Sequence, residues 1–258
     1  MDIPAQKRYR ILLIGDNCND IYVYGNITRL SPEAPVPVFQ PIEEFNTPGM
    51  AGNVCKNLEA LNCEVKFHHT ETSEKRRLID KRSKQHLIRI DNDAQCTPIY
   101  AFLRSFIDAT ELNSYDAVVI SDYNKGTVPS LLIEWIRQEY NGPVFIDTKK
   151  TDLAEFNGCY IKINQLEKSL AKTLPDDEWL IVTRGEDGAD YLGHNFKPEV
   201  SDDVIDVCGA GDTFLAALTY RFLETKDMHK AIEFANKASG ITVQHVGVYA
   251  PKIEELVP

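Results

Sequence analysis

Short apolar runs alternate with stretches of helical periodicity along most of the chain. Residues 10–15 (Arg-Ile-Leu-Leu-Ile-Gly) form the first apolar run, which ends at a glycine and predicts a buried strand. From residue 98 the alternation is regular, with helices predicted at 99–112 and 128–140 and strands at 116–120, 143–146, 160–163 and 179–182. Strands joined by crossover helices are typical of a parallel sheet. We therefore predict an α/β fold in which residues 1–258 form a single domain, because no repeat or linker divides them.

Residues 21–45 depart from this pattern. Two β-type runs there flank the segment Ser-Pro-Glu-Ala-Pro-Val-Pro at 31–37, and prolines favour edge strands because they cannot donate to a sheet ladder. A further alternating run at 86–91 follows a basic segment, which predicts a hairpin. We expect a small β-flap formed mainly by residues 20–46 and 74–91, which covers a site as a lid or pairs with a second copy of the chain.

Near the C-terminal end, the β-prone run 204–207 leads into Cys-Gly-Ala-Gly-Asp, and apolar positions with helical spacing follow from Phe214. This pattern predicts a tight turn aimed into a helix, whose first N–H groups and positive dipole end attract anions. A carboxylate at Asp212 would repel a resting phosphate, so a base that takes a proton from an attacking hydroxyl is the more economical role. An anion hole with a base suggests phosphoryl transfer; a loop with a helix-capping Asp is the alternative.

Polar residues and glycines recur where the predicted strands end. They occupy residues 121–126, 147–150, 164–167 and 183–188. Because parallel strands bind ligands beyond their carboxyl ends, four such loops in succession favour a binding site at this edge of the sheet. Asp16 and Asp20 follow the first strand and could hold sugar hydroxyls or a metal, or they could simply serve turns. Asn53 opens a predicted helix at the same edge, as a cap or as a ligand contact.

The charge of the chain and its cysteines limit the kinds of binding partner and the cellular compartment that we expect. The chain has 28 basic and 39 acidic residues, and its net charge of −11 opposes non-specific binding to nucleic acid or an anionic membrane. The segment 74–84 is locally basic, so Lys75 or Arg77 could grip a phosphate, although a solvated hairpin tip is the alternative. The six cysteines form no C-x-x-C pair, no export signal precedes them, and no apolar run approaches the ~18 residues of a membrane span. We expect reduced thiols and a cytoplasmic protein.

Several motifs together resemble the PfkB, or ribokinase-type, carbohydrate kinase family. They lie at 14–25 (I-G-D-x-x-x-D-x-Y-x-Y-G), 29–38 (R-L-S-P-E-A-P-V-P-V), 85–91 (Q-H-L-I-R-I-D), 121–126 (S-D-Y-N-K-G), 146–152 (I-D-T-K-x-T-D) and 206–213 (D-V-C-G-A-G-D-T). Within the family the likeness is greatest to the subgroup that phosphorylates D-glycero-D-manno-heptose 7-phosphate, mainly through S-P-E-A-P-V-P. The resemblance implies a ribokinase-like three-layer fold, with a mostly parallel central sheet, helices on both faces and the β-flap as lid. It also implies ATP and Mg²⁺ as cofactors, and transfer of the γ-phosphoryl group to an anomeric hydroxyl, giving the 1,7-bisphosphate.

The resemblance also implies roles for particular residues. Asp212 would be the catalytic base, and the anion hole would be formed by N–H groups of Gly209, Ala210 and Gly211. Nucleotide contacts are implied for Lys149, Asn164, Glu167, Thr183, Gly185, Gly188, Asn236 and Gly240, of which Asn164 and Glu167 would also hold Mg²⁺ through water. Substrate contacts are implied for Asp16, Asp20, Gly49, Asn53, Lys75, Arg77, Asp122 and Lys125.

The chain also departs from the family. Only 31 residues separate Asn53 from Gln85 and only 15 separate Glu167 from Thr183, so we expect a trimmed version of the fold. Met50 stands where a second glycine is usual, which could change the sugar pocket. A non-catalytic nucleotide- or sugar-binding relative with a role in assembly or regulation, and a kinase for another sugar or nucleoside, therefore remain as alternatives. The exposed edges of the flap predict a homodimer formed through it.

Overall fold

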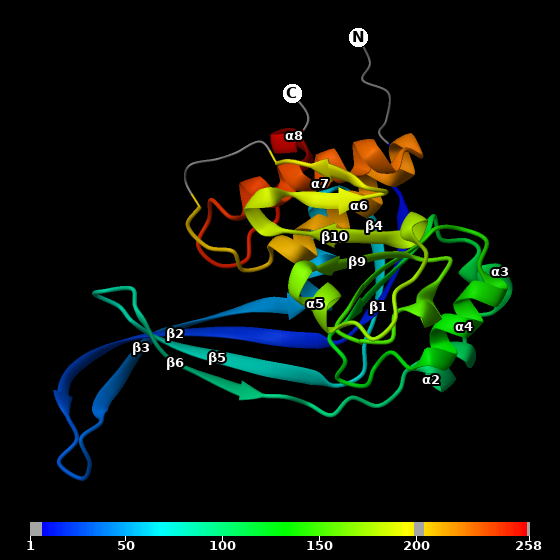
Figure 1. The fold of residues 1–258 in the computed structure, drawn as a ribbon. Coiled ribbons are helices and arrows are strands. Elements are labelled where there is room, and N and C mark those ends of the chain that lie inside the picture. The colour runs from blue at the N-terminus through cyan, green and yellow to red at the C-terminus, as the bar shows by residue number, and fades with distance from the viewer. Residues whose placement is uncertain (1–6, 199–203, 257–258) are drawn as a thin grey trace.

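The computed structural model describes residues 7–198 and 204–256, whose strands form an eight-stranded sheet in the body and a four-stranded sheet that projects from it (Figure 1). The body strands are β1 (Arg10–Gly15), β4 (Glu64–His68), β7 (Ala117–Asp122), β8 (Val144–Thr148), β9 (Tyr160–Asn164), β10 (Leu180–Thr183), β11 (Ala189–Tyr191) and β12 (His194–Phe196). Their order is β12-β11-β10-β9-β8-β7-β1-β4, and only the two pairings that β11 makes are antiparallel. The predicted mostly parallel sheet is confirmed, and the strands predicted from residue 116 onward match β7 to β10 within two residues.

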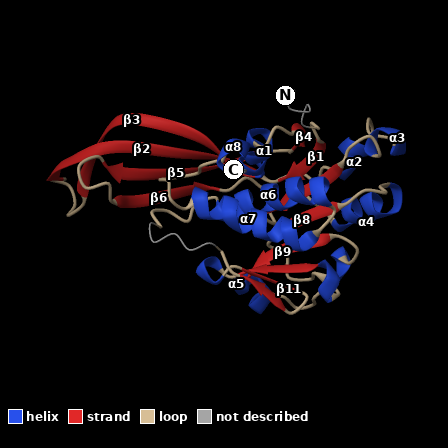
Figure 2. Ribbon diagram, turned by 90° about the horizontal axis from the view of Figure 1, so that it is seen from above, coloured by secondary structure: helices blue, strands red, loops and turns tan. Residues whose placement is uncertain are grey.

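Helices cover both faces of this sheet (Figure 2). One face carries α1 (Ala51–Ala60), α6 (Ala210–Thr225), α7 (Met228–Thr242) and α8 (Ile253–Leu256), and the other carries α2 (Tyr100–Arg104), α3 (Ala109–Leu112) and α4 (Ser130–Glu139). Successive side chains of β1 enter the two cores in turn, since Ile11 and Leu13 pack on the first face while Leu12 and Ile14 pack on the second. The three-layer arrangement is therefore confirmed.

The predicted helix at 99–112 is wrong in one respect, because it is divided into α2 and α3. The Asp108 side chain accepts a hydrogen bond from the Glu111 N–H at 2.8 Å and starts a new helix there. An Asp inside a helical pattern competes in this way for backbone donors, so periodicity alone overestimated the length of the helix. The shorter connections are three 3₁₀ turns, at Ala154–Phe156, Asp177–Trp179 and Gly185–Asp187, and the helix α5 (Gln165–Leu170).

The four-stranded sheet is the predicted β-flap. It has the order β3-β2-β5-β6, from strands β2 (Asn17–Leu30), β3 (Pro37–Met50), β5 (Thr72–Asp80) and β6 (His86–Asn92). β3 is an edge strand and carries Pro37, Pro41 and Pro48, as the proline pattern predicted. Only α1, β4 and β5 lie between Asn53 and Gln85, so the structure has no additional helix in that interval.

The two faces of the flap differ in character. Because paired residues share a face, Asp20 and Lys75 lie on the face that turns toward the body, where the Lys75 ammonium is 5.7 Å from the ring of Tyr123. The opposite face carries the apolar side chains of Ile21, Val23, Leu78, Ile88 and Ile90 together with the ion pair between Arg76 and Glu44. Ile88 and Ile90 remain 54% and 49% exposed on it. Within the described ranges, no helix is long and apolar enough to span a membrane.

Candidate active site

Asp212 lies in the first turn of α6, at the position where that helix meets the edge of the body sheet. The helix begins after Gly209, which adopts a left-handed conformation with φ of 79°. A Cβ atom at Gly209 would lie 2.8 Å from Asn53 Nδ2 and 3.0 Å from Val248 Cγ1, so this turn requires glycine for both its conformation and its close packing. The helix starts at Ala210, four residues before Phe214, where the predicted apolar positions with helical spacing begin.

The Asp212 carboxylate is buried and is held at both oxygens. Asn53 Nδ2 donates to Oδ2 at 2.9 Å, and the Tyr123 hydroxyl donates to Oδ1 at 3.0 Å. Burial raises the pKa of Asp212 to about 6, although the hydrogen bond from Asn53 opposes this change. A carboxyl group with a pKa near 6 can accept a proton from a hydroxyl at neutral pH, which suits a general base.

The first turn of α6 also provides donors for an anion. The first N–H groups of a helix have no intrahelical acceptor, and the Ala210 N–H makes only a 3.4 Å contact with the Val207 carbonyl. Beneath the turn, Lys162 Nζ donates to Asp147 Oδ2 at 2.6 Å and to the Gly211 carbonyl at 3.3 Å. Lys162 and Asp147 are both buried and form an ion pair, so together they bring no net charge under the helix end, and Lys162 fixes the turn through the Gly211 carbonyl.

A chain of side-chain hydrogen bonds fixes Asn53 against the rest of the body. Asn57 Nδ2 donates to the Asn53 side-chain oxygen at 3.3 Å, and Thr213 Oγ1 donates to Asn57 Oδ1 at 2.9 Å. The hydroxyls of Thr213 and Thr242 are 3.0 Å apart. All of these groups are buried, so α1, α6 and α7 lock together behind the Asp212 carboxylate.

A cavity of about 430 Å³ opens on the other side of the same turn. Ala210 and Gly211 line it, so the cavity reaches the start of α6. The remaining lining residues are Thr183, Gly185, Glu186, Gly188, Pro198, Val204, Val207, Phe214, Asn236, Ser239, Gly240 and Val243. The sequence-predicted nucleotide residues Thr183, Gly185, Gly188, Asn236 and Gly240 are thus brought together in one largely apolar hollow, with the free N–H groups of α6 at one end.

Glycines shape this cavity. A Cβ at Gly188, where φ is 84°, would lie 1.9 Å from the Phe196 carbonyl oxygen, so no other residue fits there. A Cβ at Gly240 would meet nothing within 4 Å, which leaves that wall open. Asn236 Nδ2 donates to the Phe196 carbonyl at 2.7 Å and thereby fixes β12 at the rim.

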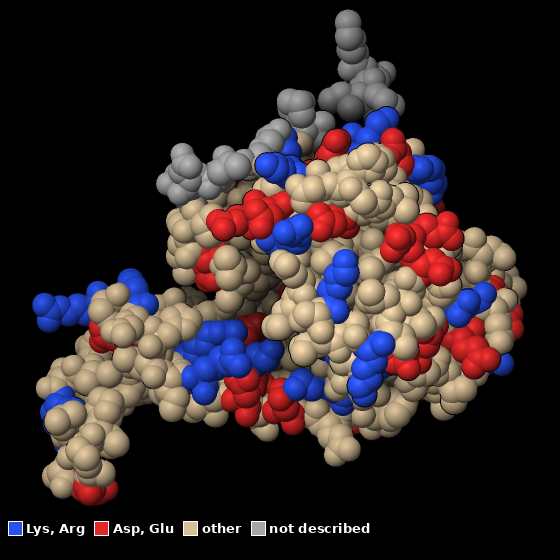
Figure 3. Space-filling view, viewed as in Figure 1, with Lys and Arg blue, Asp and Glu red and all other residues tan. Residues whose placement is uncertain are grey.

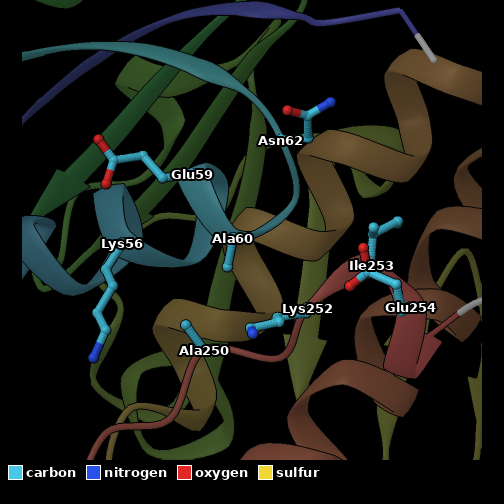
Figure 4. A pocket seen from close by; sticks show the side chains of 8 residues that line it. All are labelled: Lys56, Glu59, Ala60, Asn62, Ala250, Lys252, Ile253 and Glu254. Atoms are coloured by element: carbon cyan, nitrogen blue, oxygen red, sulfur yellow. The ribbon is translucent and has the colours of Figure 1, made fainter. Parts of the chain in front are cut away.

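A second hollow, of about 590 Å³, lies between the C-terminal end of α1 and the segment that leads into α8 (Figure 4). Its charged side chains Lys56, Glu59, Lys252 and Glu254 are all exposed and carry both signs. None of the sequence-predicted site residues lines it. We therefore place the candidate site at the start of α6, in spite of the larger volume of this hollow.

Asn164 and Glu167 begin α5 as a reciprocal capping box. The Asn164 side chain accepts the Glu167 N–H, and the Glu167 carboxylate accepts the Asn164 N–H, each at 2.8 Å. The other Glu167 oxygen pairs with Lys149, which also lies 3.5 Å from Asp147. Within residues 7–198 and 204–256, no group of three or more His, Cys, Asp or Glu side chains could hold a metal ion.

The flap contributes Asp20, Arg77 and Lys75 to the same region. Arg77 Nη1 lies 2.5 Å from Asp20 Oδ1, and both side chains are buried, so the two charges neutralise each other. Gly49 lets this carboxylate approach, because a Cβ there would lie 2.2 Å from Asp20 Oδ2. Lys75 makes no ion pair with any described residue. Figure 3 shows basic side chains gathered where β5 and β6 meet the body.

Three sequence-predicted substrate residues are occupied by contacts within the protein. Asp16 is fully buried, and its carboxylate accepts the backbone N–H groups of Tyr123, Lys125 and Thr127 at 2.8, 3.1 and 3.3 Å. Asp122 is buried against Thr148 and Lys150. Lys125 Nζ pairs with Asp93 at 2.5 Å. Asp16 and Asp122 therefore hold the loop after β7 in place.

Sequence reasoning missed Tyr123 and Lys162. Tyr123 lies inside the S-D-Y-N-K-G motif, whose charged neighbours drew attention first. Lys162 lies within a predicted buried strand, and a lysine inside such an apolar run was the available signal, since lysine is almost never buried without a partner. Its partner Asp147 stands directly beside it in the neighbouring strand β8, a pairing that only the sheet register defines.

Solved structures share this fold. Ribokinase from Thermotoga maritima superposes with a TM-score of 0.69 and 18% sequence identity, over 96% of this chain and 98% of that one. Arabidopsis thaliana ribokinase, complexed with ribose and ATP, gives a TM-score of 0.70 at 14% identity, over 97% and 98%. The fold is therefore ribokinase-like, as predicted.

Comparison with sequence relatives indicates which proteins this chain is similar to. The model of the pfkB family of carbohydrate kinases matches residues 147–255. The bifunctional protein HldE of a Nitratiruptor species is 31% identical over 298 residues, which cover 96% of this chain and 64% of that protein. HldE of Helicobacter pylori is 30% identical, over 96% of this chain and 65% of its own length. Residues 147–255 thus resemble the pfkB family of carbohydrate kinases, and the chain spans less than two thirds of the length of these relatives.

Proposed function

We propose that this protein is an ATP-dependent sugar kinase that transfers the γ-phosphoryl group of ATP to the anomeric hydroxyl of a sugar phosphate. Asp212 acts as the base that receives the hydroxyl proton, and the N–H groups of Gly209, Ala210 and Gly211 hold the transferring group. Phosphoryl transfer needs positioning and charge neutralisation more than covalent chemistry, so a helix end and one base suffice on the side of the protein.

One observation carries this proposal. The same turn of α6 presents Asp212 on one side and lines the glycine-rich cavity, through Ala210 and Gly211, on the other. A nucleotide in that cavity would direct its terminal phosphate at the free N–H groups, within reach of an acceptor hydroxyl at Asp212. A magnesium ion would travel with the phosphates and contact Glu167 through water, since the Glu167 carboxylate already accepts hydrogen bonds from Asn164 and Lys149.

We further propose that the acceptor carries a phosphate of its own, and that it is D-glycero-D-manno-heptose 7-phosphate. The S-P-E-A-P-V-P segment and the likeness to the HldE proteins support this choice. Lys75 supports it independently, because it is a cation without an ion-pair partner among the described residues, on the flap face that turns toward Tyr123. Asp20, Gly49 and Asn53 would meet the hydroxyls of the sugar, whereas Asp16, Asp122 and Lys125 would shape the site indirectly.

The assembly is part of the same proposal. We expect a cytoplasmic homodimer in which the outer faces of two flaps pack together, because Ile88 and Ile90 are otherwise exposed on them. Small-molecule substrates suit a chain with a net charge of −11 better than nucleic acid or a membrane does.

The substrate is tested by measuring ATP consumption with a panel of sugars, nucleosides and sugar phosphates, with and without Mg²⁺. We expect Mg²⁺-dependent turnover with heptose 7-phosphate and little with neutral sugars or nucleosides. Turnover confined to neutral acceptors would contradict the choice of substrate. Nucleotide binding without turnover of any acceptor would instead favour a non-catalytic relative, a reading that the occupied Glu167 carboxylate also suits.

Lys75→Met tests the proposed phosphate contact. A hydrogen bond from an ammonium to a phosphate stabilises by about 1.5–3 kcal/mol, so we expect KM for the sugar phosphate to rise roughly tenfold to a hundredfold. Lys81→Met is the matched control, because Lys81 follows the same strand and already pairs with Glu43 at 2.8 Å. Equal KM values for the two variants would rule out Lys75 as the specificity determinant.

A further inference from the structure

Tyr123 occupies the centre of the candidate site without a role in the proposed chemistry. It follows β7, and its hydroxyl lies 3.0 Å from Asp212 Oδ1. The Lys149 and Lys75 ammonium groups lie 5.3 and 5.7 Å from the centre of its ring. The side chain therefore touches the base on one side and the cations of the body and the flap on the other.

The backbone of Tyr123 is firmly anchored. Asp16, at the end of β1, accepts the N–H of Tyr123 at 2.8 Å and two further N–H groups of the same loop. Asp16 is itself fully buried. A carboxylate that accepts three backbone donors fixes the path of a loop, so the phenol is delivered to one place.

Asn53 and Tyr123 each donate a hydrogen bond to a different oxygen of the Asp212 carboxylate. Such a pair prevents rotation of the carboxylate while leaving a second lone pair on each oxygen for an acceptor hydroxyl. We propose that Tyr123 is a positioning residue for Asp212: its hydroxyl, held in place by Asp16 through the loop, sets the orientation and the basicity of that carboxylate. Its effect on turnover rests on the proposed kinase function, whereas its effect on Asp212 does not.

The charged groups around Asp212 define the direction of the effect. Asp147 on β8 raises the pKa of Asp212, and Lys162 on β9 lowers it, as does the hydroxyl of Tyr123. Burial and the nearby Asp212 carboxylate hold the pKa of Tyr123 well above 10, so the phenol stays protonated and remains a donor. Lys149 is nearby but is paired with Glu167 and Asp147. Removing the hydroxyl takes away a donor to the ionised carboxylate and must raise the pKa of Asp212 further.

The direct test is a carbon-13 NMR titration of protein labelled at the aspartate carboxyl carbons, with the Asp212 signal assigned by its loss in Asp212→Asn. In Tyr123→Phe the midpoint of the Asp212 titration should rise by about one pH unit. The matched control is Tyr140→Phe, which removes another buried phenol whose hydroxyl donates to the Tyr115 carbonyl at 3.0 Å, on the far side of the sheet from α6. An unchanged or lower midpoint in Tyr123→Phe, or an equal rise in the control, would overturn the proposal.

Turnover provides a second readout. We expect Tyr123→Phe to lower kcat about tenfold and to move the acid limb of the pH profile of kcat/KM to higher pH, with KM for ATP unchanged. A loss of thermal stability with an unaltered pH profile would assign Tyr123 a merely structural role and overturn the proposal. If the wild-type protein turned over no sugar while the NMR midpoint still moved, the kinase function would fail and the positioning role would stand.

Discussion

At the scale of the residue, burial of the ionised Asp212 carboxylate lowers the stability of the folded protein. Its pKa is raised by burial from 3.8 to about 6, so the folded protein binds the proton more tightly than the unfolded chain does. For a carboxyl group shifted in this direction, stability falls as pH rises from about 4 to about 6. At neutral pH, the ionised carboxylate therefore destabilises the fold by up to about 3 kcal/mol.

Asp212→Asn should accordingly stabilise the protein at pH 8. We expect its melting temperature to exceed that of the wild type at pH 8, with a smaller difference at pH 4.5, where the wild-type carboxyl is protonated. We expect the free energy of unfolding at pH 8 to rise by only about 1–2 kcal/mol. The new amide group has one oxygen and one NH₂ group, so its NH₂ group would face either Asn53 or Tyr123, both of which are donors. Calorimetry at both pH values measures this, and a variant that is less stable at pH 8 would contradict the assigned burial of a charge.

At the scale of the helix or strand, the geometry at the start of α6 depends on one residue, Gly209. Gly209→Ala imposes a left-handed alanine and drives its Cβ into Asn53, so we expect a loss of both stability and turnover. Gly193→Ala is the matched control, because its φ of 75° carries the same strain but a Cβ there meets nothing within 4 Å. The control should lose about 1 kcal/mol of stability and keep its turnover. Equal kinetic effects in both variants would show that packing against Asn53 is unimportant.

The helices and strands also show which parts of the fold could be predicted from the sequence alone. Strands β1 and β7 to β10 follow from continuous apolar runs, because a parallel strand buried on both faces needs no alternation. The division of α2 from α3 does not follow, since it depends on one cap at Asp108. The glycine-rich turn and the loops that line the cavity could be singled out in the sequence, because their glycines and polar residues follow predicted strands. Tyr123 and Lys162 were not, because their partners Asp212 and Asp147 are adjacent only after folding.

Four predicted site residues make contacts within the protein that their positions in the sequence did not reveal. Asp16 and Asp122 stand at strand ends where ligands bind, and their position alone could not reveal that both are buried in contacts with the loop that follows β7. Asn164 and Glu167 carry the spacing of a capping box as well as that of a family motif, and the structure records the capping box. Residue type and spacing therefore identified the candidate residues, whereas the contacts that each of them makes required the three-dimensional structure.

At the scale of the whole molecule, the flap connects the candidate site with the proposed dimer interface. Its inner face bears Lys75 and the Asp20–Arg77 pair, and its outer face bears Ile88 and Ile90. Ile88→Glu places a charge on the outer face, so we expect it to convert the proposed dimer to a monomer in light scattering. Leu131→Glu, at a 60% exposed position on α4, is the control and should leave the mass unchanged. A wild-type monomer, or an Ile88→Glu dimer, would contradict assembly through the flap.

The central claim is that Asp212 is the base of an ATP-dependent phosphoryl transfer. It is tested most directly by comparing transfer of the γ-phosphoryl group from labelled ATP to the sugar phosphate in the wild type and in Asp212→Asn. Asp108→Asn is the control, since it retains an N-cap on the remote helix α3. The account predicts that Asp212→Asn binds ATP normally and loses a factor of about 10²–10⁴ in kcat, while the control is unaffected. Wild-type turnover by Asp212→Asn would contradict the account.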